Sequence, residues 1–280
     1  MLKARKQMEN KIIAVYGNSG SYKTTTALSL TREISHRQPR AKILLISTDT
    51  TKPLLPIIAP SAKEMKGSIG RVLSGLDLSE EIIQRNSYDA ADNIGVLSYN
   101  ICENKNSFAI ASPERIDDLY SFCQMFYNYT IIDCTSDILG NSLSAKALIN
   151  AGRVVELLTC DLNGLVFDGS QEPILQSEQY GYRDYIRLLS LNPSFKQDES
   201  SMKQALGRIR GAIPYSTKTA EFFNQGRLLY EKTGDYAYDK VIKDLAAILM
   251  EEDEECLAYS SEKDSKGVAS KLMDFLAKKK

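Results

Sequence analysis

The sequence predicts an α/β fold in which a mostly parallel β-sheet carries helices on both faces. Short apolar runs and helix-like segments alternate along the chain, and the runs are apolar throughout rather than at every second residue. Strands of that kind are typical of parallel sheets that are covered on both sides. Polar residues follow several of the runs, and an open parallel sheet would gather them at the edge where ligands bind.

Each strand is predicted from a short apolar run that is bounded by turn residues. The expected strands span residues 12–16, 41–48, 94–98, 129–132, 153–159, 185–191 and 209–213. Helices are predicted from apolar periodicity and from capping residues such as Ser112, Pro113 and Glu114, which are typical of a helix start. The expected helices span residues 27–34, 68–74, 79–86, 113–127, 143–151, 170–180, 199–206, 217–224 and 238–250.

Composition bounds the class of protein. The chain has 280 residues, of which 43% are hydrophobic and 25% charged, and such values are ordinary for a soluble globular protein. Its net charge of −1 creates no general attraction for nucleic acid. The five cysteines form no Cys-x-x-Cys pair, which argues against a disulfide framework and against zinc or iron–sulfur sites. The sequence shows neither the apolar core of a signal peptide nor an apolar run of about 20 residues that could span a membrane. We therefore expect one domain over residues 1–250, in the cytoplasm.

The loop between the first expected strand and the first expected helix has the composition of a phosphate-binding loop. In such loops backbone N–H groups surround the phosphates, a lysine reaches the β- and γ-phosphate oxygens, and the next hydroxyl ligates Mg²⁺. Lys23 and Thr24 have those two positions, while Gly17 and Gly20 allow close backbone approach with positive φ. The alternative is an ordinary strand–turn–helix corner. The residues expected to bind the nucleotide are Gly17, Asn18, Ser19, Gly20, Ser21, Tyr22, Lys23, Thr24 and Thr25.

Two aspartates follow expected strands and belong to the same edge. Asp133 has the place of a Walker B aspartate, which holds a water bound to the Mg²⁺ of ATP. Thr24 and Asp133 are therefore the expected metal ligands, and ATP and Mg²⁺ the expected cofactors. Asp49 would orient the attacking water or sense the γ-phosphate, and with Lys23 it forms the expected catalytic pair. The alternative for Asp49 is a turn or helix cap.

The order of these motifs resembles the MinD/ParA group of deviant-Walker ATPases over about residues 10–250. Beyond the phosphate loop, Asp49 and Asp133, the matching segments are residues 154–164, 191–192, 211–215 and 224–229. The last two segments are more specific than any single phosphate loop. The resemblance implies a three-layer P-loop NTPase fold and an ATP-dependent homodimer, with the adenine held by Asn192 and the segment around Pro214. The residues of the loop and of segment 133–137 most resemble those of the CpaE/TadZ branch, which localises pilus or secretion machinery.

Two positions depart from the pattern of that group. The lysine that characterises the group, which crosses the dimer interface to the partner's phosphates, aligns with Asn18. Loss of one such electrostatic contact typically costs about 10²–10³-fold in rate, so we expect slow hydrolysis unless another lysine, such as Lys52, serves. Tyr22 replaces the usual glycine before Lys23, and a positive φ there would be strained. The sequence therefore supports ATP binding more strongly than ATP hydrolysis.

The last thirty residues form a tail of two parts. Residues 251–266 begin with an acidic run and read as a polar linker. Residues 267–280 predict a short basic amphipathic helix with Val268, Leu272, Phe275 and Leu276 on one stripe. Such a helix can lie on an anionic membrane and resembles the membrane-targeting helix of MinD; the alternatives are a frayed terminus or a helix docked on its own domain.

The sequence thus favours a nucleotide-switched, dimeric and slow ATPase that positions or assembles cellular machinery of the pilus, secretion or division-site type. Its expected partners are a second copy of itself, a protein of the localised machinery, and an anionic membrane on the inner face of the cell. One alternative is a ParA-type DNA partition ATPase, against which the net charge and the acidic tail argue. Another is an ATP-binding scaffold with vestigial hydrolysis.

Overall fold

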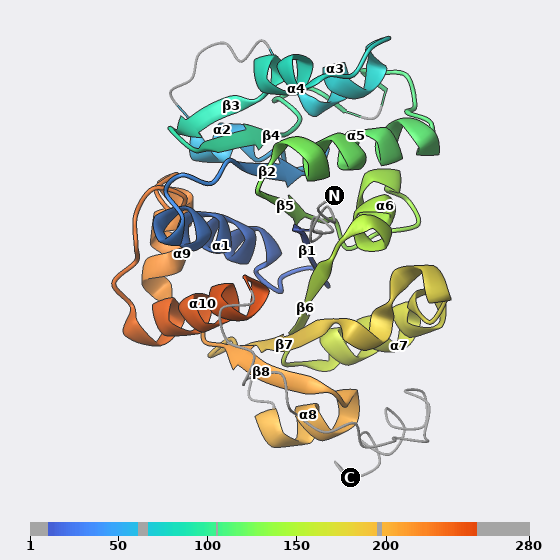
Figure 1. Cartoon of the computed structure of the whole chain (residues 1–280). Coiled ribbons are helices and arrows are strands. Elements are labelled where there is room, and N and C mark those ends of the chain that lie inside the picture. Colours follow the sequence, from blue (N-terminus) through green and yellow to red (C-terminus); the bar gives the residue numbers. More distant parts are fainter. Residues whose placement is uncertain (1–10, 61–66, 105, 195–197, 251–280) are drawn as a thin grey trace, which may run out of the picture.

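Strand β1 (Ile12–Gly17) lies inside an eight-stranded sheet with the order β3-β4-β2-β5-β1-β6-β7-β8 in the described part of the chain (Figure 1). Its neighbours β5 and β6 run parallel to it, and every other pair is also parallel except the edge hairpin of β3 and β4. The computed structural model describes residues 11–60, 67–104, 106–194 and 198–250. The tail expected at 251–280 lies outside these residues.

The other strands are β2 (Ile43–Ser47), β3 (Tyr88–Ala91), β4 (Ile94–Leu97), β5 (Tyr129–Asp133), β6 (Arg153–Thr159), β7 (Ile186–Ser190) and β8 (Ile209–Ile213). The helices are α1 (Lys23–Arg37), α2 (Leu55–Ile58), α3 (Ile69–Ser74), α4 (Glu80–Asn86), α5 (Pro113–Phe126), α6 (Ser142–Asn150), α7 (Leu162–Leu175), α8 (Glu199–Leu206), α9 (Thr217–Asn224) and α10 (Tyr236–Leu249). Two short 3-10 turns, η1 (Glu178–Tyr180) and η2 (Tyr182–Asp184), precede β7. No described helix has the length and apolar character needed to cross a membrane.

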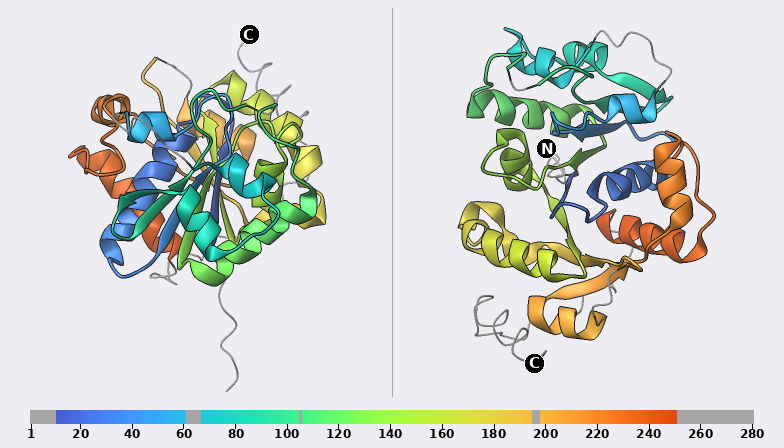
Figure 2. Two further views of the ribbon diagram at one scale, coloured as in Figure 1. Left: turned by 90° about the horizontal axis from the view of Figure 1, so that it is seen from above. Right: turned by 180° about the vertical axis from the view of Figure 1, so that it is seen from behind.

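Helices cover both faces of the sheet, so the expected three-layer arrangement is confirmed (Figures 1 and 2). Alternate residues of β1 point to opposite faces of the sheet. Ile13 and Val15 belong to the hydrophobic cluster that contains buried residues of α1 and α10. Ile12, Ala14 and Tyr16 belong to the opposite cluster, with buried residues of α5 and α6. Both faces of β1 are therefore apolar, as its uniformly apolar run in the sequence predicts.

The strand register aligns the carboxyl ends that carry polar groups. Val15 and Ser47 both pair with Asp133, and Ser190 pairs with both Thr159 and Ile213. The loops after β1, β2, β5, β6, β7 and β8 consequently leave the sheet at one edge. This is the edge at which ligands bind in open parallel sheets.

Most predicted elements are present, with one clear error. The helix expected at 170–180 is α7, which begins at Leu162, directly after β6, and ends at Leu175. Gly164, Gly169 and Pro173 give this segment weak helix propensity, which hid its start in the sequence. A local cap supports the start of the helix, because the Asp161 side chain accepts from Gly164 N at 3.0 Å. The edge strand β3 and the short helix α2 were not predicted from the sequence.

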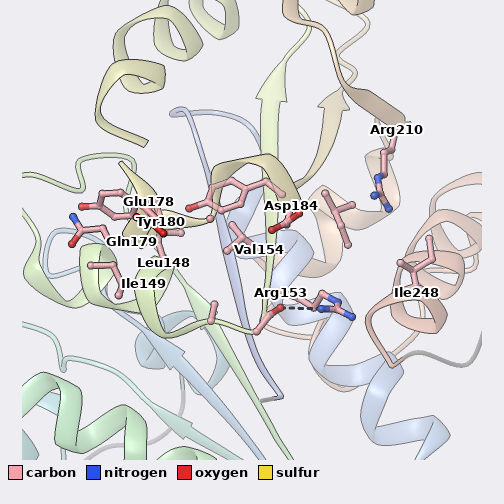
Figure 3. A pocket seen from close by; sticks show the side chains of 15 residues that line it. Leu148, Ile149, Arg153, Val154, Glu178, Gln179, Tyr180, Asp184, Arg210 and Ile248 are labelled. Carbon is pink, nitrogen blue, oxygen red and sulfur yellow. Dashed lines mark hydrogen bonds between the residues drawn. The ribbon is translucent and has the colours of Figure 1, made fainter. Parts of the chain in front are cut away.

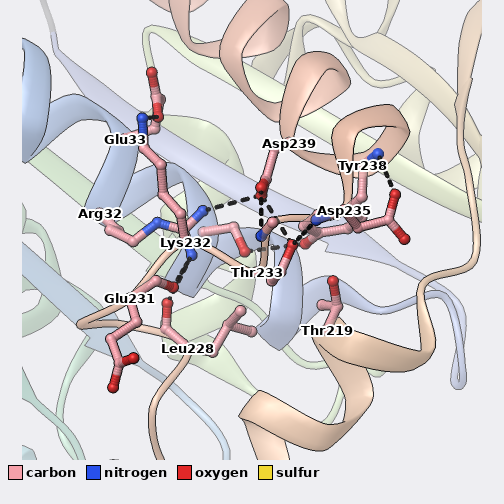
Figure 4. Close-up of polar contacts among 12 residues, drawn as sticks. Arg32, Glu33, Thr219, Leu228, Glu231, Lys232, Thr233, Asp235, Tyr238 and Asp239 are labelled. Atoms are coloured by element: carbon pink, nitrogen blue, oxygen red, sulfur yellow. Dashed lines mark hydrogen bonds and ion pairs between the residues drawn. The ribbon is translucent and has the colours of Figure 1, made fainter.

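Helix α1 begins earlier than expected, at Lys23, and is fixed to the last part of the fold (Figure 4). The Arg32 guanidinium donates to the carbonyl oxygens of Leu228 and Glu231 at 3.0 and 2.7 Å. It also lies 3.7 Å from Asp239, at the start of α10. These contacts hold the helix that carries Lys23 and Thr24 against the segment that follows α9.

A buried ion network joins β6, β7 and α7. The Arg187 guanidinium donates to Glu156 Oε2 at 2.6 Å and to Asp168 Oδ1, and all three side chains are almost completely buried. Burial raises the pKa of both carboxyl groups, against the effect of the guanidinium. Burial alone would lower the pKa of Arg187, but the two acids raise it above its ordinary value. The network thus explains why α7 packs where weak local propensity would not place a helix.

Replacing Arg187 with Met should lower the free energy of unfolding by about 3–5 kcal/mol, because two carboxyl groups would remain buried without their cation. Urea unfolding at pH 7.5 measures the change. The loss should shrink at pH 5, where protonation of the two acids relieves the unpaired charge. The matched control is Arg227→Met, which removes an exposed pair with Glu231 and should leave the urea midpoint unchanged. Equal midpoints for Arg187→Met and wild type would contradict a stabilising role of the network.

Candidate functional site

The loop from Gly17 to Tyr22 leaves β1 and enters α1 at the polar edge of the sheet. Gly17 has φ 147°, and a Cβ built there would lie 1.9 Å from the carbonyl oxygen of Leu157. Gly20 has φ 81°, a conformation that residues with a Cβ rarely adopt. The predicted need for glycine at both positions is therefore met by backbone geometry.

Lys23 and Thr24, in the first turn of α1, meet residues of β5 and of the loop that follows it. Lys23 Nζ donates to Asn18 O and to Ser136 Oγ, both at 2.8 Å. Thr24 Oγ1 donates to Asp133 Oδ2 at 2.8 Å. Burial lowers the pKa of Lys23, and the nearby carboxylate of Asp133 opposes that shift. The structure thus brings together the expected phosphate lysine and both expected metal ligands.

Asp133 has one carboxylate oxygen to spare. Its Oδ1 is buried, and neither this oxygen nor the buried hydroxyl of Ser47 makes a hydrogen bond of good geometry within the described residues, although the Ser47 hydroxyl lies close enough to lower the pKa of Asp133. Burial raises the pKa of Asp133 to about 6, although Thr24 and Lys23 act to lower it. A hydroxyl and an unpaired carboxylate oxygen are ligands that suit Mg²⁺ or its bound water. The donor set therefore fits the expected magnesium site.

The Asn18 side chain is turned into the protein and holds the loop to β6. Its Nδ2 donates to Thr159 Oγ1 at 2.7 Å, and its Oδ1 accepts from Thr159 N at 2.9 Å. Thr159 Oγ1 in turn donates to Asp161 Oδ1, the cap of α7. Asn18 is only 3% exposed, so its side chain would influence a bound nucleotide through the conformation of the loop rather than by direct contact. Its side chain fixes the loop instead of replacing the missing positive charge.

Asp49 lies in a turn after β2. Its Oδ1 accepts from Thr51 N, Thr51 Oγ1 and Lys52 N at 2.7, 2.6 and 3.1 Å, as the alternative of a turn cap describes. Its negative charge nevertheless raises the pKa values of Lys23 and Asp133, so it belongs to the same electrostatic environment. The positive charge of Lys52 acts in the opposite direction on Lys23. A catalytic role of Asp49 remains a prediction.

The residues expected to hold the base lie beside the loop. Asn192 follows β7, and its Nδ2 donates to the Tyr22 hydroxyl at 3.0 Å. Pro214 and Tyr215 follow β8, and the rings of Tyr215 and Tyr22 have centroids 6.3 Å apart. The ends of β7 and β8 are tied by the bond from Leu191 N to Ile213 O at 2.9 Å. Ser19 is exposed on the loop, and Thr25 is half-buried in the first turn of α1.

Sequence reasoning missed several hydroxyl residues that shape the site. Ser136 Oγ accepts a hydrogen bond from Lys23 Nζ, and Thr159 Oγ1 accepts one from Asn18 Nδ2. Ser190 Oγ donates to Ser21 O at 2.6 Å. Each follows or ends a parallel strand, at the edge where Asp133 and Asn192 lie. A search for hydroxyl residues at the carboxyl ends of the predicted strands would have found them.

A separate cavity of about 430 Å³ lies at the opposite edge, where β6 and β7 begin (Figure 3). Its lining includes Arg153, Tyr180, Asp184, Arg210 and Ile248. It contains neither the glycine loop nor the hydroxyl and carboxylate pair described above. We therefore do not assign the nucleotide to this cavity.

The wild-type protein should lose about 1 kcal/mol of stability between pH 5 and pH 8 through Asp133 alone. An acid whose pKa is raised in the folded state stabilises that state at low pH, and the contribution is lost as pH rises through about 6. Asp133→Asn should abolish this component, as measured by urea unfolding at the two pH values. Asp77→Asn, which changes an exposed acid, should keep the wild-type pH dependence. Identical pH slopes for Asp133→Asn and wild type would contradict the raised pKa.

Comparison with known proteins gives the family of folds. No protein-family model and no curated protein sequence matches the chain. Solved structures do match, among them a ParA family ATPase from Chlorobium tepidum with a TM-score of 0.73 and 15% identity, over 85% of this chain and 97% of that one. MinD from Pyrococcus horikoshii, solved with Mg-ADP, matches with a TM-score of 0.68 and 15% identity, over 87% and 99%.

A third match is a putative plasmid partition protein from Borrelia burgdorferi bound to AMPPNP. Its TM-score is 0.63 at 14% identity, and the match covers 87% of this chain and 100% of that one. At such low identities the likeness concerns the fold. The chain therefore has the three-layer P-loop fold of the MinD and ParA ATPases.

Proposed function

We propose that this protein is a nucleotide-switched ATPase of the MinD/ParA type, which binds ATP with Mg²⁺ and associates with a second copy of itself. The observation that carries this proposal is the convergence of Lys23, Thr24 and Asp133 at one sheet edge, where the buried Asp133 Oδ1 makes no hydrogen bond of good geometry within the described residues. Structures of the same fold have been solved with Mg-ADP and with AMPPNP, which supports the assignment of the ligand class.

The residues of the site divide the binding of a triphosphate between them. Lys23 Nζ donates hydrogen bonds to Ser136 Oγ and to the Asn18 carbonyl oxygen in this structure. In the complex it would turn to the phosphate oxygens. Thr24 and Asp133 would hold Mg²⁺, which supplies positive charge to the phosphates. Backbone N–H groups at the start of α1 add to this, because helix N-termini favour anions. The loop itself is already fixed by the Asn18 contacts to β6.

Hydrolysis should be slow, because the site lacks the lysine that the MinD/ParA pattern places at position 18. The side chain at that position, Asn18, is neutral and makes two hydrogen bonds with Thr159. Lys52 is the candidate for a substitute charge, since it is exposed and its charge already reaches Lys23. If the protein binds ATP but does not turn it over, it is an ATP-binding scaffold rather than a working enzyme.

The machinery that this ATPase positions is proposed from the sequence. The fold is shared by proteins named for septum-site determination and for plasmid partition, so it does not separate these roles. A MinD of Aquifex aeolicus is also solved in complex with MinC, which illustrates a protein partner. The amino-acid sequence of the loop favours a pilus or secretion system of the CpaE/TadZ kind. Salt-dependent binding of duplex DNA would favour the partition role instead.

Wild-type protein should bind one ATP per chain in the presence of Mg²⁺ and elute as a dimer in gel filtration. Lys23→Ala should weaken ATP binding about 10–100-fold, because hydrogen bonds to charged groups contribute about 1.5–3 kcal/mol each. It should also elute as a monomer. The control is Lys203→Ala, which changes an exposed pair on α8 and should behave as wild type. A wild-type protein that takes up no ATP, or a Lys23→Ala variant with unchanged affinity, would end this proposal.

Membrane attachment is proposed through residues 267–280, which lie outside the described part of the chain. Truncation before residue 267 should abolish co-sedimentation with vesicles that contain anionic lipid, and ATP should strengthen the binding of the full chain. One short tail binds weakly, whereas two tails on a dimer gain by avidity. Neutral vesicles are the control. If the full and truncated chains sediment alike, the tail is not a membrane anchor.

A further inference from the structure

Tyr22 adopts a backbone conformation that tyrosine rarely occupies. Its φ of 62° and ψ of 29° lie in the left-handed region, at the position directly before α1. In the described part of the chain, only Cys102 and Arg208 share a positive φ without being glycine. Glycine would occupy this position without strain, and strained residues that persist are often part of a functional site. The side chain should therefore contribute something that glycine cannot.

Neither helix capping nor core packing explains the side chain. Tyr22 makes no side-chain bond that caps α1, and it is half-buried, outside the hydrophobic clusters of the described residues. Its main-chain oxygen accepts the helical bond from Thr26 N at 2.9 Å, which a glycine would also provide. What remains is the position of the ring.

The ring of Tyr22 lies against the two segments that follow β7 and β8. Its hydroxyl accepts from Asn192 Nδ2 at 3.0 Å, while Asn192 Oδ1 accepts from Ser194 N at 2.9 Å and so fixes the amide. The Tyr215 ring is tilted by 53° at a centroid distance of 6.3 Å, and it remains 38% exposed. Two aromatic rings and one oriented amide thus lie together at this edge of the sheet.

This place lies immediately beside the phosphate loop. Lys23 is the next residue of the chain, and the bond from Ser190 Oγ to Ser21 O at 2.6 Å holds the loop against the end of β7. A nucleotide that has its phosphates at Lys23 and extends past the end of β7 toward Asn192 would bring its base to the Tyr22 ring.

We propose that Tyr22, together with Tyr215, forms the stacking surface for the purine base of the nucleotide, and that base binding explains the strained backbone of Tyr22. The inference rests on the proposed function, because it assigns the base subsite of the same ligand. A purine offers a larger π-face than a pyrimidine. Base–aromatic stacking contributes measurably for every base, and the ring area therefore favours ATP over CTP.

The test compares ligands with and without a base on the full-length protein. Tyr22→Gly keeps the left-handed backbone and removes the ring. It should weaken Mg-ATP binding about 10-fold, weaken Mg-CTP binding less, and leave Mg-tripolyphosphate binding unchanged, as measured by titration calorimetry. Tyr22→Phe retains the ring and should recover most of the ATP affinity. Tyr215→Ala should reduce affinity for ATP but not for tripolyphosphate.

Cys102→Gly is the matched control, because it relieves a φ of 69° at an exposed position away from the loop and should leave all three affinities unchanged. Unchanged or tighter ATP binding by Tyr22→Gly would overturn the inference, the second result showing that the ring obstructs the site. Equal loss of tripolyphosphate binding would also overturn it, because the ring would then shape the phosphate loop. If wild type binds tripolyphosphate no less tightly than ATP, the base subsite is absent while the phosphate site stands. If it binds neither ligand, the proposed function fails and the inference with it.

Discussion

The position of β1 between β5 and β6 is the constraint on which the rest of the site depends. Parallel pairing in this register places the end of β1 beside Asp133 on one side and Leu157 on the other. Only glycine fits at position 17, because the carbonyl of Leu157 occupies the space of a Cβ. The loop must then turn into α1 at that edge, and the first turn of α1 meets the end of β5. The contact between Thr24 and Asp133 follows from strand order as much as from the motif.

The polar groups of the site are held in place by the fold before any ligand arrives. Thr159 fixes Asn18, and Ser190 fixes the Ser21 carbonyl. A preorganised loop of this kind lowers the entropic cost of binding. Asp133 and Ser47 differ, because the buried Asp133 Oδ1 and Ser47 Oγ make no hydrogen bond of good geometry within the described residues, and burial raises the pKa of Asp133. A buried carboxylate oxygen without a donor is where a cation would gain most.

The departures from the MinD/ParA pattern have different physical characters. Asn18 exchanges a charge for two short bonds to β6, so the loop gains rigidity and loses the electrostatic contact that would favour turnover. Tyr22 exchanges an unstrained glycine for a ring that faces Asn192 and Tyr215. Under the proposed function, the first change would affect the phosphate end of the nucleotide and the second its base. Together they would favour holding a nucleotide over cleaving it quickly.

The sequence by itself determined the layers, the strands with uniformly apolar runs, the glycine loop and the aspartate that ends β5. These are local signals, because a buried strand, a turn and a helix start are each written in a few neighbouring residues. Only the tertiary structure decided that α7 begins at Leu162, that Asn18 faces inward, and that Tyr22 meets Asn192. The partners of Lys23, Asn18 and Tyr22 lie 113, 141 and 170 residues away along the chain. Such contacts arise when strand order brings distant loops to one edge, and no short stretch of sequence records that order.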